Sequence, residues 1–183
     1  MLSFLLLIIG FFICDQVQSQ DLSCKFLVNT VSEYTGKVHQ ETENVYFFSF
    51  SPKAQKRNNL DEDFLKVEGQ VIRKDDDLSL LLTFVFRTKD AEDGYGSIAA
   101  GTALQLYDLK SKKIELKTEK VAQIVKTNQE VMYKCNFTIS NKDIKALKTF
   151  EIDAISLNFT KGYQRFDVFY LDFLSDHLNC IFP

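Results

Sequence analysis

Tryptophan is absent from this 183-residue sequence, and histidine and proline each occur only twice. Without tryptophan the chain lacks the Gly-x-Trp entry of lipocalin-type carriers, so that class is not supported. Scarce proline, together with 45% hydrophobic and 26% charged residues, excludes a disordered or low-complexity chain. The formal net charge of −3 is too close to neutral for the electrostatic footprint of nucleic-acid binding. We therefore expect a folded protein with no nucleic-acid partner.

The sequence also lacks an apolar run long enough to cross a membrane. Apolar residues run from Phe4 to Ile13 with one glycine among them, and polar residues follow. A spanning helix needs about 20 apolar residues, whereas this run has the length of a secretory h-region. We therefore expect residues 1–19 to be a signal peptide that is cleaved after Ser19. The mature chain is then exported, either secreted or periplasmic, with no transmembrane segment.

Two features keep a retained or lipid-anchored form open as an alternative. No lysine or arginine precedes the apolar run, and Cys14 stands where a lipid-attachment cysteine could lie. The bulky residues before Cys14 do not match the small residues of a lipoprotein signal, so cleavage and release is the preferred interpretation. Residues 20–183 then form a single β-rich domain, which is long enough to bury its own core.

The mature chain has an odd number of cysteines, Cys24, Cys135 and Cys180. An oxidising compartment would permit one disulfide and one free thiol, and three pairings are open. Cys24 and Cys180 are the disulfide candidates, because the two ends of a domain are often close in space. Cys135 lies on the apolar face of an alternating segment at 131–139, which is typical of a buried free thiol. The cysteine spacing matches no metal site, and we expect no cofactor.

Apolar residues alternate with period two along most of the domain, which predicts a β-dominated fold. The predicted strands are 26–31, 45–50, 64–72, 78–86, 103–107, 113–121, 131–139, 150–159 and 163–168. The short links at 108–112 and 161–162 predict two antiparallel hairpins.

Two helices are predicted beside these strands. Ser140 and Asp143 resemble a capping box, so a short helix is expected near 141–148. Apolar residues then recur at helical spacing at Leu171, Leu174, Leu178 and Ile181. This spacing predicts a C-terminal helix near 169–181 whose apolar stripe covers the sheet. The expected fold class is α+β, as an antiparallel sheet or a flattened barrel.

Several segments carry a more specific pattern. They are a signal that ends in Ser-Gln, SEYTGK at 32–37, AGTALQLY at 100–107 and ISNKDIKAL at 139–147. Together they resemble uncharacterised exported proteins of the Bacteroidetes type, over most of the mature chain. The resemblance implies an exported domain and brings no catalytic residue. A eukaryotic origin stays open beside it, because Asn136 and Asn158 lie in Asn-x-Thr sequons that a eukaryotic secretory pathway would glycosylate.

Catalysis has little support in the sequence. His39 and His177 match no nucleophile or zinc motif, and no phosphate-binding glycine loop or nucleophile elbow occurs. The arrangement that would favour an enzyme is a spatial one. It would be a histidine beside Cys135, or beside a carboxylate in a pocket.

Three acidic clusters, at 61–63, 75–77 and 90–93, carry the carboxylates that calcium prefers. None matches the twelve-residue calcium loop, and each lies between predicted strands, where charged residues are normally solvated. The sequence therefore predicts no metal site.

Aromatic residues are abundant, with seventeen phenylalanines and seven tyrosines. The segment Tyr46, Phe47, Phe48 and Phe50 would place aromatic side chains on both faces of one strand, which a second layer, a partner protein or a ligand pocket would explain. The preferred hypothesis is a non-enzymatic binding domain at or outside the cell envelope, with an unknown protein or a small hydrophobic ligand as partner. The alternatives are a hydrolase with an unrecognised site and a carrier of a small hydrophobic ligand.

Overall fold

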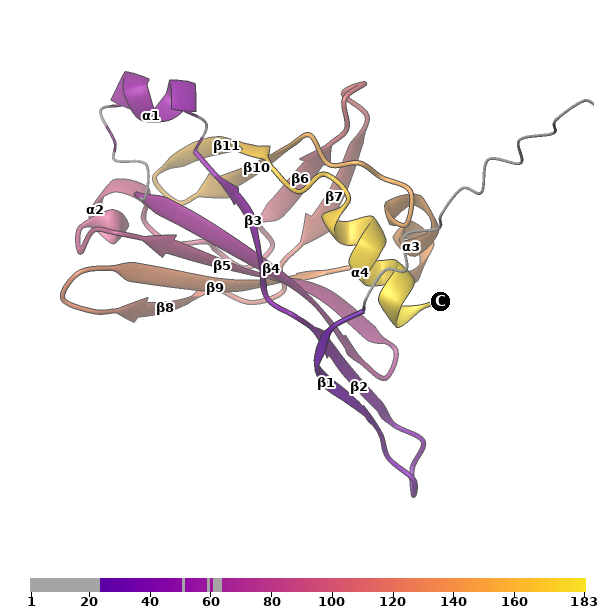
Figure 1. Ribbon diagram of the computed structural model, residues 1–183. Helices are drawn as coiled ribbons and strands as arrows, with labels where there is room; N and C mark the ends of the chain where they lie inside the picture. Colours follow the sequence, from indigo (N-terminus) through magenta and orange to yellow (C-terminus); the bar gives the residue numbers. More distant parts are fainter. Residues whose placement is uncertain (1–23, 51, 59, 61–63) are drawn as a thin grey trace, which may run out of the picture.

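The computed structural model describes residues 24–50, 52–58, 60 and 64–183 (Figure 1). The expected signal peptide and the acidic cluster at 61–63 lie outside these residues. The described part forms one antiparallel sheet with four short helices, so the β-dominated α+β class is confirmed.

The strands are β1 (Phe26–Val31), β2 (Val38–Thr42), β3 (Val45–Ser49), β4 (Leu65–Lys74), β5 (Asp77–Phe86), β6 (Ala103–Tyr107), β7 (Lys113–Lys117), β8 (Gln123–Lys126), β9 (Val131–Thr138), β10 (Ala154–Phe159) and β11 (Gly162–Val168). The helices are α1 (Pro52–Asn58), α2 (Ala91–Tyr95), α3 (Asn141–Leu147) and α4 (Phe173–Ile181). Both predicted hairpins, β6–β7 and β10–β11, are antiparallel pairs, and both predicted helices are present as α3 and α4.

The sheet closes on itself. The strand order β4-β3-β11-β10-β6-β7-β9-β5 returns to its start, because β5 also pairs with β4 over its whole length. Of the two arrangements that the sequence left open, the structure has the closed one. The ring has one narrow seam, where Lys117 of β7 and Thr138 of β9 are the only paired residues. The hairpin β1–β2 continues from β4 beyond the ring and projects from the body of the molecule (Figure 1).

Alternation along the strands divides the inside of the ring from its outside. On β5 the residues from Leu78 to Phe86 alternate between buried and partly exposed, and on β9 Val131, Tyr133, Cys135 and Phe137 are buried. Helix α4 covers the inner face at one end of the ring. The ring of Phe173 on α4 lies on Gly69 of β4, where an added Cβ would be 2.7 Å from its Cζ atom.

A bulge in β3 explains the aromatic cluster near its start. The pairing of β3 with β4 shifts between Tyr46 and Phe48, so that Phe47 is an extra residue. Phe47 and Phe48 are therefore both fully buried instead of lying on opposite faces. The ring of Phe47 packs 4.5 Å from that of Phe173 on α4, and the ring of Phe48 lies 5.0 Å from that of Phe166. The sequence left a second layer, a partner protein or a ligand pocket as explanations for these aromatic residues, and the structure has the second layer, which is α4.

Two predicted strands are shorter in the structure. The strand expected at 113–121 ends at Lys117, because the chain turns at the next residue, where the Thr118 hydroxyl donates to the Lys120 carbonyl. The strand expected at 150–159 begins only at Ala154, since the chain first leaves α3 through an irregular segment. The short elements β2, β8, α1 and α2 were not predicted.

Candidate functional site

A groove opens on the outer face of the sheet beside Asn136. One edge of β9 pairs with β8 at 131–134 and with β7 at Thr138 alone, and the linking segment 118–122 passes by without pairing. The outward side chains of β9 between these two contacts are therefore left uncovered. The resulting groove has a volume of about 510 Å³.

The groove is lined from three parts of the chain. Its lining includes Ser79 and Leu81 of β5, Lys134, Asn136 and Thr138 of β9, and Glu119, Lys120, Val121 and Gln123 from the segment before and at the start of β8. The linking segment is fixed from below, because Ala122 is buried and its N–H donates to the Ile98 carbonyl at 2.9 Å. Val121 beside it is 61% exposed and stands on the rim. The anchored linking segment thus forms one wall of the groove.

The polar groups of the groove differ in how far they are already engaged. The Glu119 carboxylate accepts a hydrogen bond from the Thr138 hydroxyl at 3.4 Å. Within the described part of the chain, by contrast, no carboxylate forms an ion pair with Lys120 or Lys134. The Asn136 side chain likewise makes no hydrogen bond there. The groove therefore offers ammonium and amide groups that a ligand could bind.

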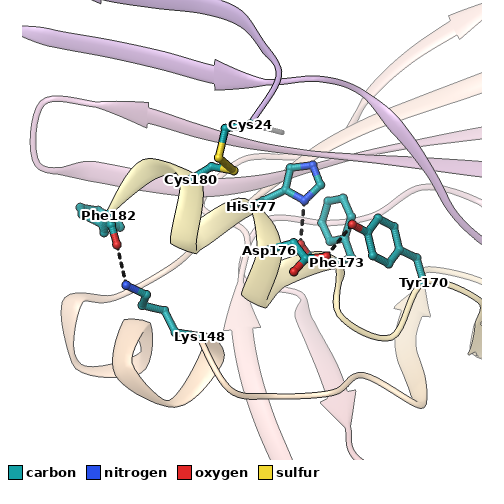
Figure 2. Close-up of a disulfide and its surroundings, with 8 residues drawn as sticks. All are labelled: Cys24, Lys148, Tyr170, Phe173, Asp176, His177, Cys180 and Phe182. Carbon is teal, nitrogen blue, oxygen red and sulfur yellow. Dashed lines mark hydrogen bonds between the residues drawn. A yellow bond between two sulfur atoms is a disulfide. The ribbon is translucent and has the colours of Figure 1, made fainter. Parts of the chain in front are cut away.

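His177 lies in a second, much smaller space beside α4 (Figure 2). This crevice measures about 50 Å³, and its lining includes Glu43, Tyr170 and Asp176. The Nδ1–H of His177 donates to the Phe173 carbonyl at 2.7 Å, which leaves Nε2 without the ring proton of the neutral form. The Tyr170 hydroxyl donates to Asp176 Oδ2 at 2.6 Å. The Nδ1–H of His177 and the Asp176 carboxylate are therefore already engaged, and Nε2 is the ring nitrogen left as an acceptor.

Burial decides the charge of His177. The residue is 8% exposed, and desolvation lowers its pKa below the ordinary value, against the hydrogen bond to the Phe173 carbonyl and the charges of Asp176 and Glu43. His177 is consequently neutral at pH 7. A space of 50 Å³ holds no more than a few water molecules, since one water needs about 10–15 Å³ by this measure. The crevice has the carboxylate that an enzyme hypothesis required, but no room for a substrate.

His39 lies elsewhere, on the projecting hairpin, where it lines an open hollow of about 410 Å³ together with Lys74 and Asp75. Its Nε2 atom is 2.7 Å from Glu41 Oε1 on the same face of β2. The Cys135 thiol is not beside either histidine. It is 2% exposed inside the ring, and burial raises its pKa although a hydrogen bond with Thr118 opposes the shift. The structure thus brings each histidine next to a carboxylate and neither next to the thiol.

The two disulfide candidates are bonded to each other. Cys24 and Cys180 form a disulfide across a sequence separation of 156 residues, and Cys135 is a free, buried thiol. The bond joins Cys24, two residues before β1, to the last turn of α4 (Figure 2). It therefore closes the domain near its two ends.

The two sequon asparagines are both exposed. Asn136 lies in the outer groove, and Asn158 lies near the end of β10, opposite Tyr163 of β11. The third residue of the second sequon, Thr160, is engaged, because its hydroxyl oxygen accepts a hydrogen bond from the Ser97 N–H at 2.9 Å. Both asparagine side chains are accessible to a modifying enzyme.

The described acidic clusters serve the fold. Asp75 lies in the turn between β4 and β5, where its carboxylate accepts a hydrogen bond from the Val38 N–H at 2.8 Å. Glu92 on α2 forms an ion pair with Lys126 of β8. In the described ranges no group of three or more histidine, cysteine, aspartate or glutamate residues is placed to hold a metal ion.

Among the described residues, no helix combines the length and the apolar character needed to span a membrane. No family model, curated protein or solved structure matches the chain.

Proposed function

We propose that this chain is an exported binding domain without catalytic activity, and that the groove beside Asn136 holds its ligand. The observation that carries the proposal is the contrast between this groove and the crevice beside His177. The groove has ten times the volume of the His177 crevice and contains ammonium and amide groups that have no partner among the described residues. The crevice is small, and its Asp176 carboxylate and the Nδ1–H of His177 are already bonded.

Export is supported by the disulfide between Cys24 and Cys180, because such bonds persist in oxidising compartments. The apolar N-terminal run and the disulfide therefore both support export. Purification of the protein from its native secretion medium or periplasm, followed by mass spectrometry, tests this part. A mature product that begins at Gln20 is expected, and a chain that retains residues 1–19 would contradict it.

The lining indicates the chemistry of the ligand. Lys120 and Lys134 attract a carboxylate, the Asn136 amide donates to and accepts from hydroxyl groups, and Leu81 gives an apolar patch for carbon atoms. These groups together suit a small hydroxyl-rich acid, such as a sugar acid. A hydrophobic ligand inside the ring is less well supported, because aromatic rings fill that space: Phe84, Phe86, Tyr133, Phe159 and Phe166 lie in mutual contact.

The test is an NMR titration of the oxidised mature chain, made in bacteria so that Asn136 carries no glycan. Galacturonate is added in one series and galactose in another. We expect galacturonate to shift the amide signals of 119–123 and 134–138, with weaker shifts for galactose. Lys134→Gln should weaken galacturonate binding at least fivefold, while the matched variant Lys112→Gln, on the β6–β7 turn, should leave it unchanged.

Two results would overturn the proposal. The first is the absence of shifts around the groove at millimolar concentrations of either sugar. The second is reproducible turnover of a hydrolase substrate that His177→Asn abolishes, since this would place the activity in the crevice beside α4. His177→Asn is the suitable change, because an amide N–H can replace the Nδ1–H that donates to the Phe173 carbonyl.

A further inference from the structure

The outer edge of β1 is unpaired within the described part of the chain. Strand β1 pairs with β2 alone, and β2 in turn pairs with β4. The β1–β2 hairpin also projects from the body of the molecule, so that the ring does not cover this edge (Figure 1). An open edge of this kind can accept another strand.

The backbone of β1 is oriented for such pairing. The Ser32 N–H donates to the Lys37 carbonyl at 2.8 Å, so these two residues form a hydrogen-bonded pair of the hairpin. Bonded and non-bonded pairs alternate in an antiparallel ladder, and the next pair, Val31 and Val38, is therefore non-bonded. The Val38 N–H indeed donates to the Asp75 carboxylate instead. By the same alternation, the N–H and C=O groups of Asn29 and Val31 point away from β2 toward the open edge.

The side chains on this edge are unusual for a solvent-exposed strand. Leu27 is 64% exposed and Val31 is 61% exposed, and the strand between them contains no charge and no proline. Proteins commonly protect an open edge with charged residues, above all lysine, and with proline, and β1 has neither. The nearest charges along the sequence flank the strand, as Lys25 before it and Glu33 after it.

The sequence of this edge is complementary to itself. When two copies run antiparallel with Asn29 opposite Asn29, Leu27 of one copy lies opposite Val31 of the other. The same arrangement brings Lys25, just before the strand, toward Glu33, which lies in the turn just after it, at both ends of the pairing. The same register places the outward-pointing backbone groups of the two Asn29 residues opposite each other, where a hydrogen-bonded ladder requires them. Leu27, opposite Val31, lies at an irregularity in the β1–β2 pairing between Phe26 and Val28, so its contribution is the apolar contact. Apolar contact, charge and hydrogen bonding therefore all favour one arrangement.

We propose that two copies of this chain associate through their β1 strands, antiparallel and centred on Asn29. The association joins the two sheets edge to edge and uses a surface separate from the groove, so it does not depend on the proposed ligand. A pair of six-residue strands covers less area than the roughly 1,200–2,000 Å² of a stable interface. The dimer is accordingly weak and depends on protein concentration.

Sedimentation velocity of the oxidised mature chain, residues 20–183, over a concentration series tests the proposal. A shift from monomer to dimer is expected as the concentration rises toward 1 mM. Val31→Lys places a charge in each of the two contacts between Leu27 and Val31, and it should raise the dissociation constant at least tenfold. The matched control is Leu109→Lys, because Leu109 is 67% exposed and lies on the β6–β7 turn, far along the chain from β1. This control should leave the dissociation constant unchanged.

A charge exchange tests the register. Lys25→Glu alone and Glu33→Lys alone each bring like charges together and should weaken the dimer several-fold, whereas the double variant should restore it. Because Lys25 also lies 3.7 Å from Glu43 in its own chain, Glu43→Gln is the control and should not affect the dimer. Circular dichroism and thermal melting confirm that each variant is folded.

Three results would overturn the inference. They are a protein that stays monomeric up to 1 mM, a dimer that Val31→Lys does not weaken, and a double charge exchange that fails to restore association. Capture of an unrelated peptide by β1 with no self-association would count against it in the same way.

Discussion

At the residue scale, Gly69 shows how one position shapes the core. The ring of Phe173 occupies the space where a side chain of residue 69 would lie, and it cannot move away freely, because the rings of Phe47 and His177 pack at 4.5 and 4.3 Å on it. A glycine in a strand interior normally weakens the strand. Here the glycine allows α4 to approach the sheet closely enough to cover one end of the closed sheet.

We therefore predict that Gly69→Ala lowers the free energy of unfolding by about 1–3 kcal/mol through overpacking. The measurement is urea unfolding followed by circular dichroism. Phe173→Leu removes the clashing atom, so the double variant should cost less than the sum of the two single changes. Additive costs would show that the ring of Phe173 does not constrain residue 69. Gly94→Ala is a matched control, because no atom lies within 4 Å of an added Cβ there.

At the element scale, α4 is held to the rest of the molecule at both of its ends. Phe173 anchors its start on β4, and Cys180 bonds its last turn to Cys24. The Lys148 ammonium, just beyond α3, also donates to the Phe182 carbonyl at 2.5 Å (Figure 2). The helix thus closes the ring because several independent contacts hold it there.

The disulfide should contribute a large share of this stability. Cys24→Ala and Cys180→Ala should each lower the free energy of unfolding by about 2–5 kcal/mol, and the double variant should cost about the same as either single change. Cys135→Ala removes only a buried thiol and should cost roughly 1 kcal/mol. Urea unfolding without reductant measures all four variants. A cost for Cys135→Ala as large as that for Cys24→Ala would contradict the assigned roles.

The elements also show what the sequence could predict. Strands β5 and β9 were predicted because their apolar residues form long regular patterns, and the terminal helix was predicted from its spacing. The bulge at Phe47 and the short strands β2 and β8 were missed, because they depend on pairing with distant residues and leave no local periodicity.

The candidate site was predictable only in part for the same reason. Asn136 attracted notice as a sequon residue, but nothing local relates it to Lys120 or to Ser79. The groove arises because β7 and β8 contact β9 at separate places, with an unpaired segment between them. Such a gap is a property of strand register, which alternation along a single strand does not specify.

At the scale of the whole molecule, the closed ring leaves few buried groups that titrate near neutral pH. His177 is the buried histidine of the described part, while His39 is partly exposed on the hairpin. The Nδ1–H of His177 donates to the Phe173 carbonyl in its own helix, and the imidazole ring packs on the ring of Phe173. Protonation would therefore place a charge in the contact between α4 and the sheet.

The stability of the protein should consequently fall as the pH is lowered. Burial keeps the pKa of His177 below its ordinary value of about 6.5, so the unfolded chain binds a proton at a higher pH than the folded chain does. The contribution is fully present above about pH 6.5 and is lost progressively as the pH falls below it. Urea unfolding at pH 7.5, 6.5 and 5.5 should show this decrease. His177→Asn should make the decrease smaller, and His39→Gln should retain the part due to His177. An equal decrease in the His177→Asn variant would mean that other groups, and not the buried histidine, cause the loss.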